Sequence, residues 1–245
     1  MNMTLKALTL ITAMSFSGVT YAAPITLFTT DFDSTMPAEI SPGTALLTGV
    51  QGYAGLGPIG NQFGGNFLRS ETANVVTLQL NNLAAHSAIN LSFLFAAIDS
   101  LDGTGTFPQG DFFSVTVDGV TIFNESFANA APSQIQSYVP PPGVELARHV
   151  DLGFSGPGSY YTDSAYNMGV DPVFSNIAHT ASTLTLKFSI QGNGIQDLND
   201  ESWAMDNLTI TAIPAAVPVP AAAWLLGSGL LGLIGVARRK AARSA

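Results

Sequence analysis

Carboxylates beside predicted turns are the residues of this sequence best suited to chemistry. Asp99, Asp102 and Asp111 bracket a Gly-rich stretch, and Glu201 and Asp206 follow together in a later segment. Ca²⁺ prefers oxygen ligands of this kind and takes about six to eight of them. We therefore expect a structural calcium ion at Asp99, Asp102 and Asp111, joined by Glu201 or Asp206.

Other uses of these acidic residues stay open. Asp31 and Asp33, near the first predicted strand, are a second possible cation site. Aspartate is also an ordinary turn residue, because its side chain bonds to the nearby backbone. A glycosidase uses two facing carboxylates, but Glu201 and Asp206 are five residues apart and point to opposite faces of a strand unless a bulge intervenes. These residues therefore favour a metal site over catalysis.

Nucleophilic catalysis and thiol chemistry find little support. The sequence has no cysteine, which excludes disulfides and zinc-thiolate sites. His86, His149 and His179 have no nucleophile motif nearby and are expected at surfaces or turns. Gly55-Leu-Gly-Pro-Ile-Gly60 matches the dinucleotide spacing, but Pro58 and the Gly-rich surroundings predict a loop rather than a helix start. We do not expect an enzyme.

Aromatic residues offer a different possibility. The strand-poor segment Phe154 to Asn176 holds Tyr160, Tyr161 and Tyr166 among small and polar residues, a composition suited to stacking against sugars. The alternative is that these rings cap a core. Trp203 is expected in the core.

The elements that must position these residues read as strands. Val76 to Leu80 and Thr183 to Ile190 alternate apolar and polar residues, as half-buried strands do. Asp118-Gly119 between two alternating runs predicts a hairpin. The expected strands cover 25–30, 76–80, 89–98, 113–117, 120–124, 183–190 and 204–212. Val144 to Leu152 is the one weak helical candidate, so we predict an all-β antiparallel two-sheet sandwich over residues 23–213.

Three short motifs carry a resemblance for this domain. They are Ile98-Asp-Ser-Leu-Asp-Gly103, Asp111-Phe-Phe-Ser-Val-Thr-Val-Asp-Gly119 and Asp200-Glu-Ser-Trp-Ala-Met-Asp-Asn-Leu208. Together they resemble exported jelly-roll domains of the carbohydrate-binding-module or lectin type. The resemblance implies a jelly-roll sandwich that associates with glycans.

Charge is distributed unevenly along the chain. All 17 acidic residues lie between Asp31 and Asp206, where Arg69, Arg148 and Lys187 are the basic ones, and that segment carries a net charge of −14. No basic face exists that could displace counterions from phosphates, so we expect no nucleic-acid partner.

Both ends read as targeting segments. Lys6 followed by an uncharged apolar run and small residues predicts a signal peptide over 1–22, cut by signal peptidase after Ala22. Near the other end, residues 214–220 form a Pro/Ala spacer, 221–237 are uncharged, and 238–245 are basic. Seventeen helical residues span about 25 Å, so with the Lys/Arg cluster behind them they predict a transmembrane helix with a cytoplasmic tail.

This C-terminal layout resembles a known sorting signal. The residues are Val217, Pro218 and Pro220, then the Leu/Gly-rich span, then Arg238, Arg239 and Lys240. They look like a PEP-CTERM signal, although Val219 stands where that family has Glu. The resemblance implies processing by an exosortase in the inner membrane, often in bacteria that build an exopolysaccharide matrix.

These expectations combine into one hypothesis. The chain is an exported protein held in the inner membrane by its C-terminal helix, with contacts to membrane lipid and the domain outside the cytoplasm, and then delivered to the cell surface or secreted. Its domain is expected to be a non-catalytic, glycan-associated module, with exopolysaccharide as a candidate partner. The alternatives are a secreted glycan-active hydrolase and a purely structural matrix protein without a ligand.

Overall fold

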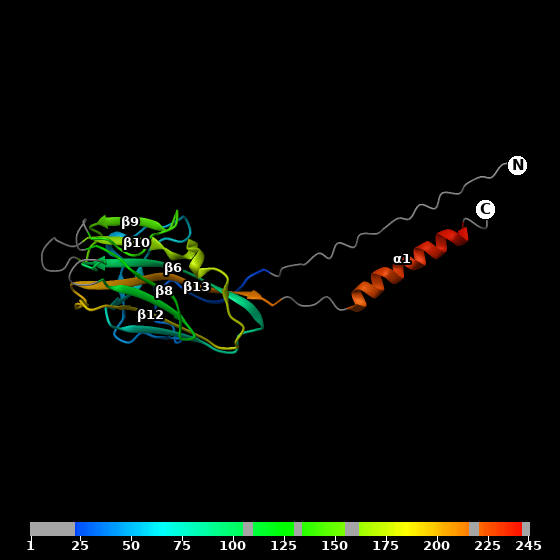
Figure 1. The fold of residues 1–245 in the computed structure, drawn as a ribbon, viewed down its shortest axis with the longest axis horizontal. Coiled ribbons are helices and arrows are strands. Elements are labelled where there is room, and N and C mark those ends of the chain that lie inside the picture. The colour runs from blue at the N-terminus through cyan, green and yellow to red at the C-terminus, as the bar shows by residue number, and fades with distance from the viewer. Residues whose placement is uncertain (1–22, 105–109, 130–133, 155–161, 216–220, 242–245) are drawn as a thin grey trace.

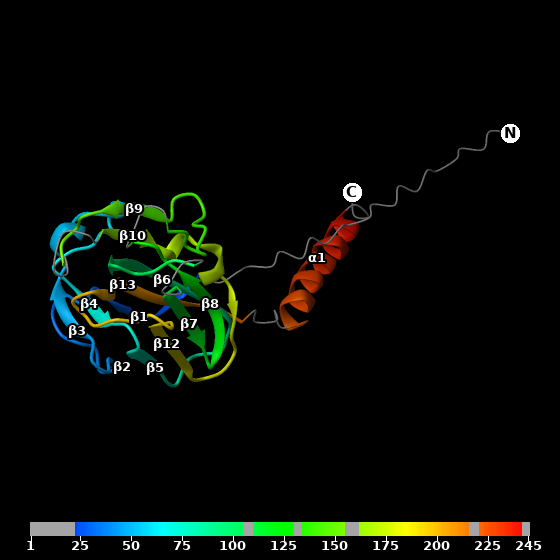
Figure 2. The same cartoon turned by 60° about the vertical axis from the view of Figure 1, so that its left-hand side comes forward.

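The computed structural model describes residues 23–104, 110–129, 134–154, 162–215 and 221–241. Within them the chain forms two antiparallel β-sheets packed face to face (Figures 1 and 2). The predicted all-β antiparallel two-sheet sandwich is therefore confirmed. The signal peptide over 1–22 and the sorting residues Val217, Pro218 and Pro220 lie outside the described residues.

The larger sheet has the strand order β3-β4-β13-β6-β10-β9, with β1 added beside β13 and β11 beside β6. Its strands are β1 (Ile25–Thr30), β3 (Leu46–Gly49), β4 (Asn66–Glu71), β6 (His86–Asp99), β9 (Glu145–Val150), β10 (Asp163–Asn167), β11 (Ile177–Ala178) and β13 (Glu201–Pro214). The smaller sheet has the order β2-β5-β12-β7-β8. Its strands are β2 (Ile40–Ser41), β5 (Val75–Leu80), β7 (Phe112–Val117), β8 (Val120–Ser126) and β12 (Leu184–Gln191).

The helical elements are short, with one exception. Three 3₁₀ turns occur in the described loops: η1 (Gln51–Tyr53), η2 (Met168–Val170) and η3 (Pro172–Phe174). The segment predicted to be a helix over 221–237 forms α1 (Ala221–Ala241). Among the residues that the structure describes, no helix combines the length and apolar character needed to cross a membrane. The prediction that 221–237 spans a membrane is not confirmed.

The predicted hairpin is present between β7 and β8. Val117 pairs with Val120, and the two residues between them have positive φ angles, 48° at Asp118 and 82° at Gly119. A tight turn with positive φ at both central residues matches the right-handed twist of its strands. This turn fixes which residues of β7 and β8 face the core.

The central strand β6 is apolar on both faces because it separates two hydrophobic clusters. Phe93, Phe95 and Ala97 point between the sheets, whereas Leu94, Ala96 and Ile98 belong to a second cluster. That second cluster is completed by residues of the 50–67 segment, among them Tyr53, Phe63 and Phe67. A strand buried on both faces loses the alternation of a half-buried one.

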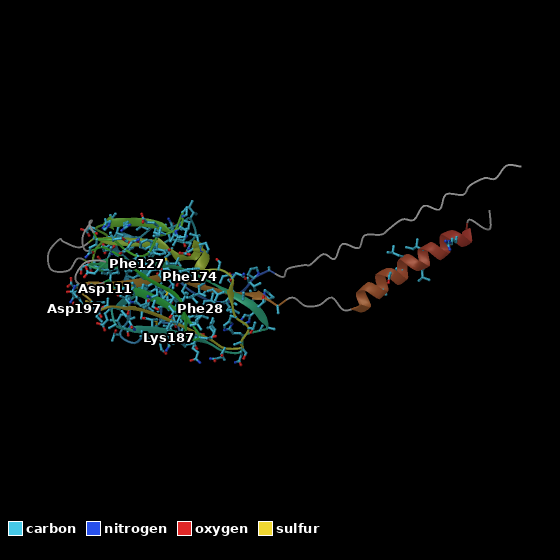
Figure 3. The ribbon with its side chains drawn as sticks, in the orientation of Figure 1. Phe28, Asp111, Phe127, Phe174, Lys187 and Asp197 are labelled. Carbon is cyan, nitrogen blue, oxygen red and sulfur yellow. The ribbon has the colours of Figure 1, made fainter. Side chains whose placement is uncertain are left out.

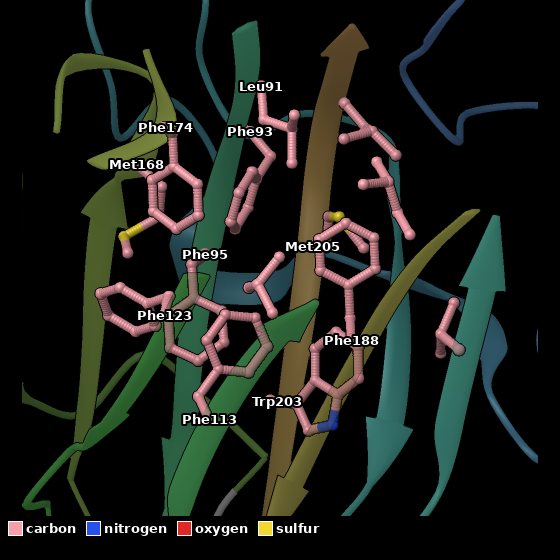
Figure 4. Close-up of a cluster of buried hydrophobic side chains, with 14 of the residues drawn as sticks. Leu91, Phe93, Phe95, Phe113, Phe123, Met168, Phe174, Phe188, Trp203 and Met205 are labelled. Atoms are coloured by element: carbon pink, nitrogen blue, oxygen red, sulfur yellow. The ribbon is translucent and has the colours of Figure 1, made fainter. Parts of the chain in front are cut away.

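Aromatic rings fill the space between the sheets (Figure 4). Phe113 of the smaller sheet lies 4.2 Å from Phe95 of the larger sheet, centroid to centroid, and 5.4 Å from Trp203. Trp203 is fully buried, so its predicted core position is confirmed. Buried aromatic pairs at such distances contribute about 0.5–1.5 kcal/mol each beyond the burial of their area.

Two predictions about the irregular segments are wrong. The weak helical candidate Val144 to Leu152 forms the edge strand β9, which pairs with β10. The segment Phe154 to Asn176, predicted to be strand-poor, contains β10, and every residue of β10 is buried. Asp163, Ser164 and Asn167 are polar, so the sequence of β10 lacks the apolar residues that mark a buried strand. These polar side chains are buried together with their hydrogen bonds.

Candidate metal centre

Three carboxylates meet at one end of the sandwich, opposite the end at which β13 finishes. Asp102 comes from the connection between β6 and β7, Asp111 immediately precedes β7, and Glu201 begins β13. One oxygen from each lies within 4.8 Å of the others. Figure 3 shows Asp111 at this end of the molecule. The group thus joins the two sheets where the core ends.

Strand alternation explains why these side chains converge. Glu201 is two residues before Trp203 on β13, and Asp111 is two residues before Phe113, so each shares the inward direction of a core ring. Both carboxylates are 0% exposed and Asp102 is 5% exposed. Acidic side chains are rarely buried so deeply without a compensating charge.

Hydrogen bonds compensate part of this negative charge. Asp111 Oδ2 accepts from the backbone N–H of Asp102 at 2.8 Å, and Asp102 Oδ1 accepts from Gln134 Nε2 at 2.5 Å. Glu201 accepts from the backbone N–H of Gln196 at 2.8 Å and from its side-chain amide at 3.2 Å. The amides of Gln134 and Gln196 are thus the neutral partners of the cluster.

One oxygen is left over. Asp111 Oδ1 has no hydrogen-bond partner among the described residues, although it is completely buried. A buried acceptor without a donor costs about 1–3 kcal/mol, and more when it is charged. Asp111 also interacts with the Glu201 carboxyl, so this oxygen is satisfied either by a proton shared with Glu201 or by a bound cation.

Electrostatics point the same way. Burial raises the pKa of the Asp111 carboxyl, and the charge of Asp102 raises it further. Burial also raises the pKa of Glu201, with the charge of Asp111 as the next cause. The pKa of Asp102 is raised by burial too. The site therefore holds either protons or a positive ion in place of three free negative charges.

Gly192 lies close beside Asp111. A Cβ atom placed on Gly192 would lie 2.7 Å from the carbonyl oxygen of Gly110 and 2.9 Å from Asp111 Oδ1. Only glycine allows the chain after β12 to approach this closely. Three carboxylates form a hard oxygen donor set, which suits Ca²⁺ rather than a soft transition metal.

Two of the predicted ligands lie elsewhere. Asp99 pairs with Glu201 across β6 and β13, but its Oδ2 lies 3.8 Å from an Arg69 guanidinium nitrogen. Asp206 accepts hydrogen bonds from the backbone N–H groups of Gly64 and Asn207. The five-residue spacing places Asp206 on the other face of β13 from Glu201, as the alternation predicts, so the structure brings together Asp102, Asp111 and Glu201 alone of the five.

The comparisons with known proteins leave the family open. No protein-family model matches the chain. No curated protein matches it either. Solved structures with distant similarity include the Agl-KA catalytic domain, which is 15% identical with a TM-score of 0.33 over 84% of this chain and 32% of that chain.

Two further solved structures are similar at the same distant level. The Clostridium thermocellum endo-1,4-beta-D-xylanase 10B CBM22-1-GH10 modules, complexed with xylohexaose, are 12% identical with a TM-score of 0.25 over 72% of this chain and 26% of that one. The GH87 alpha-1,3-glucanase catalytic domain in complex with nigerose is 18% identical with a TM-score of 0.28 over 79% and 30%. This chain spans about a third or less of the length of each structure it matches.

The prediction that Tyr166 is exposed for stacking against sugars is wrong. This residue lies on β10, is 0% exposed, and donates its hydroxyl proton to Gln136 Oε1 at 3.3 Å. The alternative reading, in which the ring packs in the core, is correct for Tyr166. Tyr160 and Tyr161 lie outside the described residues.

Two histidines that the sequence predicts at surfaces or turns are buried. His86 and His179 were expected at surfaces or turns, yet they are 3% and 7% exposed and contact each other. No spacing rule relates residues 93 positions apart, so only the pairing of β11 with β6 reveals this contact. His149 is half-buried on β9.

Proposed function

We propose that the chain is an exported surface or matrix protein whose calcium-bound jelly-roll domain associates with glycans without catalysis. The observation that carries the proposal is the buried group of Asp102, Asp111 and Glu201 with its orphaned Asp111 oxygen. Calcium at about millimolar concentration outside cells fills even weak sites of extracellular modules. A domain that needs this ion to close its core is suited to work outside the cell.

The strand pairings support the jelly-roll type. Among the eight central strands, the first pairs with the last, β4 with β13, and the second with the seventh, β5 with β12. The third pairs with the sixth, β6 with β10, and the fourth with the fifth, β7 with β8. A ribbon of paired strands folded in this way over two sheets is a jelly roll.

Export and sorting are proposed from the two ends of the sequence. An N-terminal signal peptide would bring signal peptidase, and the C-terminal segment with Arg238, Arg239 and Lys240 would bring the exosortase and membrane lipid. The acidic residues all lie between these ends, which agrees with a domain held outside a membrane whose cytoplasmic side keeps the basic tail.

A groove on the outer face of the smaller sheet is the glycan-binding surface we favour. It has a volume of about 370 Å³ and is lined by Val75, Phe112, Ser114, Thr116, Asn124, Lys187, Ser189 and Gln191. Hydroxyls and amides on neighbouring strands offer paired hydrogen bonds to sugar hydroxyls, and the half-buried Phe112 offers one apolar ring. The net charge of −14 on the domain favours neutral over acidic polysaccharides.

The same geometry weighs against a hydrolase. The facing carboxylates of Asp111 and Glu201 are 0% exposed, so a sugar could not reach them without opening the end of the sandwich. A glycosidase needs its acid pair on either side of a bound glycosidic bond. We therefore propose a binding rather than a catalytic role.

Calcium binding is tested by thermal unfolding of the full chain with excess calcium and with chelator. A bound ion at 100 times its dissociation constant adds about 2.7 kcal/mol to the free energy of unfolding. We expect this gain in the wild type and in Asp31→Asn, which removes a carboxylate of the second possible cation site instead. Asp111→Asn and Glu201→Gln are expected to lose it. Identical curves with calcium and chelator would remove the metal site, and a gain that survives Asp111→Asn would move it elsewhere.

Glycan association is tested separately, on calcium-loaded protein. Binding to neutral and acidic polysaccharides is measured for the wild type, for Phe112→Ala with Gln191→Ala, and for Leu46→Ala as an exposed control on the larger sheet. We expect neutral polysaccharide binding that weakens at least tenfold in the groove variant alone. Absence of binding to every polysaccharide favours the structural matrix protein, and release of free sugars favours the hydrolase.

A further inference from the structure

Two buried histidines form a continuous chain of contacts at the end of the sandwich where β6 begins. His86 Nδ1 lies 2.7 Å from the carbonyl oxygen of Ala84, and His86 Nε2 lies 2.6 Å from His179 Nδ1. His179 Nε2 lies 3.0 Å from Asp118 Oδ2. The two rings are nearly parallel, with 13° between their planes. Each of the four ring nitrogens therefore has a partner at hydrogen-bond distance.

Three hydrogen bonds along these contacts would require a definite number of protons on the two rings. Ala84 O and the Asp118 carboxylate can only accept, so His86 Nδ1 and His179 Nε2 must each carry a proton. The central contact joins two nitrogens, and one of them must carry a third proton. Two neutral imidazoles hold two protons between them. All three contacts can therefore be hydrogen bonds only when the pair holds one proton more than two neutral rings, balanced by Asp118.

The residues that the structure describes add no second charge beside the two rings. Among the described residues, Asp118 is the carboxylate within 4.0 Å of either ring. The other packed elements contribute neutral residues: β11 is Ile-Ala, β13 ends in Ile213-Pro214, and β6 begins His-Ser-Ala-Ile. On β12 the contact is the backbone N–H of Thr185, which donates to Asp118 Oδ1 at 2.8 Å, and Lys187 is the exposed cation two residues further along.

The contacts of His86, His179 and Asp118 also connect separate elements of the fold. Asp118 belongs to the β7–β8 turn of the smaller sheet. His86 begins β6 in the larger sheet and pairs with Pro214 at the end of β13. His179 comes directly after β11. The contacts therefore join the two sheets at the end opposite the proposed calcium site.

We propose that His86, His179 and Asp118 form a proton-dependent latch that is closed when the histidine pair holds one shared proton. A second extra proton places two N–H groups against each other across the central contact. Loss of the shared proton leaves one of the three contacts without a donor. The latch opens in both cases, and it frees the β7–β8 turn from the larger sheet.

The latch predicts an unusual dependence of stability on pH. The change of unfolding free energy with pH follows the difference in bound protons between the unfolded and native states. Two unfolded imidazoles together hold about one proton near pH 6.5. Below that pH they hold more than the latch does, so stability rises with pH, and above it they hold fewer, so stability falls. The latch thus contributes a stability maximum near neutral pH, with a limiting slope of about tenfold in the unfolding constant per pH unit.

Side-chain nitrogen NMR of the full, calcium-loaded chain tests the proton count directly. At pH 6.5 we expect the His86 and His179 rings together to carry three N–H protons, with the central one shared between two nitrogens. His149, which contacts Thr162 Oγ1 at 3.4 Å instead, serves as the internal reference. Two neutral rings, or two independently titrating rings in the native protein, would overturn the proposal even if every variant failed to fold.

Variants test the consequence for stability. Unfolding midpoints are measured from pH 5 to 8.5 for the wild type, His86→Gln, Asp118→Asn and the control His149→Gln. We expect the stability of the wild type relative to His86→Gln and to Asp118→Asn to be greatest near pH 6.5, and the control to keep the wild-type profile. The same pH profile in the wild type and His86→Gln would contradict the latch.

Discussion

Asp206 lies at a bulge of β13, where the register with β6 shifts between Asp206 and Thr209. Its two oxygens accept hydrogen bonds from the backbone N–H groups of Gly64 at 3.1 Å and Asn207 at 2.7 Å. Asn207 has a positive φ of 51°, a conformation that asparagine tolerates better than most residues. The residue predicted as a calcium ligand is thus a structural acceptor that holds the 62–66 segment against the sheet.

The environment of Asp206 makes stability depend on pH. Burial raises the pKa of its carboxyl to about 7, and the charges of Asp33 and Asp31 contribute to the rise. Because this value lies above the unfolded pKa of about 3.9, the stabilising contribution is complete below about pH 4 and is lost as the pH rises through 7. Because pH 5 and pH 8 lie about equally far from the maximum of the proposed latch near pH 6.5, we expect Asp206 to make the wild type less stable at pH 8 than at pH 5.

Urea unfolding of Asp206→Asn at pH 5 and pH 8, with calcium saturating, checks this expectation. The variant should be less stable at pH 5 by about 1–3 kcal/mol, because an amide nitrogen now faces a backbone N–H. Its stability should change less between the two pH values than that of the wild type. Asp151→Asn, at an exposed site, is the control and should keep the wild-type slope. An equal change of unfolding free energy between pH 5 and pH 8 in all three proteins would contradict the assignment of this pH dependence to Asp206.

At the scale of elements, the β7–β8 hairpin connects several features of the domain. β7 carries the core ring Phe113 and follows Asp111 of the candidate metal centre, while the turn carries Asp118 of the proposed latch. The turn itself depends on Gly119, whose φ is 82°. A Cβ atom at Gly119 would meet nothing within 4 Å, so the demand for glycine is conformational rather than steric.

Replacing this glycine isolates the cost of the turn. We expect Gly119→Ala to lower the free energy of unfolding by about 1–2 kcal/mol, since an L-residue is strained in the left-handed region. Gly49→Ala on β3 is the control, because Gly49 has no positive φ and its Cβ would meet only Gly65 O at 4.0 Å. The control should change stability by about 0.5 kcal/mol or less. Similar urea midpoints for the two variants would show that the turn does not require glycine.

At the scale of the whole molecule, the two ends of the sandwich are closed by different chemistry. Three buried carboxylates lie at one end and the contacting pair of His86 and His179 at the other, each joining one sheet to its neighbour. The aromatic core fills the space between the two sheets (Figure 4). We therefore expect the stability of this domain to depend on the calcium concentration and on the pH.

The proposed sorting also belongs to this scale. Replacing Arg238, Arg239 and Lys240 together by Ala should reduce retention of the full chain in the inner-membrane fraction, because the basic cluster fixes the cytoplasmic side. A charge-conserving control, Arg238→Lys with Arg239→Lys, should be retained like the wild type. Cell fractionation with and without an exosortase provides the measurement. Full-length protein in the cytosol, or equal retention of both variants, would contradict the proposed topology.

Local pattern was enough for much of the architecture. Alternation in residues 76–80 and 183–190 and the Asp118-Gly119 turn predicted strands that are present as β5, β12, β7 and β8. Half-buried strands and tight turns follow rules that act within a few residues. The short strands β2, β3 and β11 gave no such signal. β10 was missed because its polar residues are buried in hydrogen bonds.

The sequence by itself determined the strand-rich class, the acidic domain between two apolar ends, and the choice of carboxylates as the residues for a metal. Only the tertiary structure decided which carboxylates meet. Glu201 begins β13, and Asp102 and Asp111 lie in the connection between β6 and β7, while Asp99 turns to Arg69 and Asp206 to the backbone of Gly64. The reason is that convergence depends on register and pairing between strands about 100 residues apart, such as Glu201 opposite Asp99, and no local pattern encodes that partner choice.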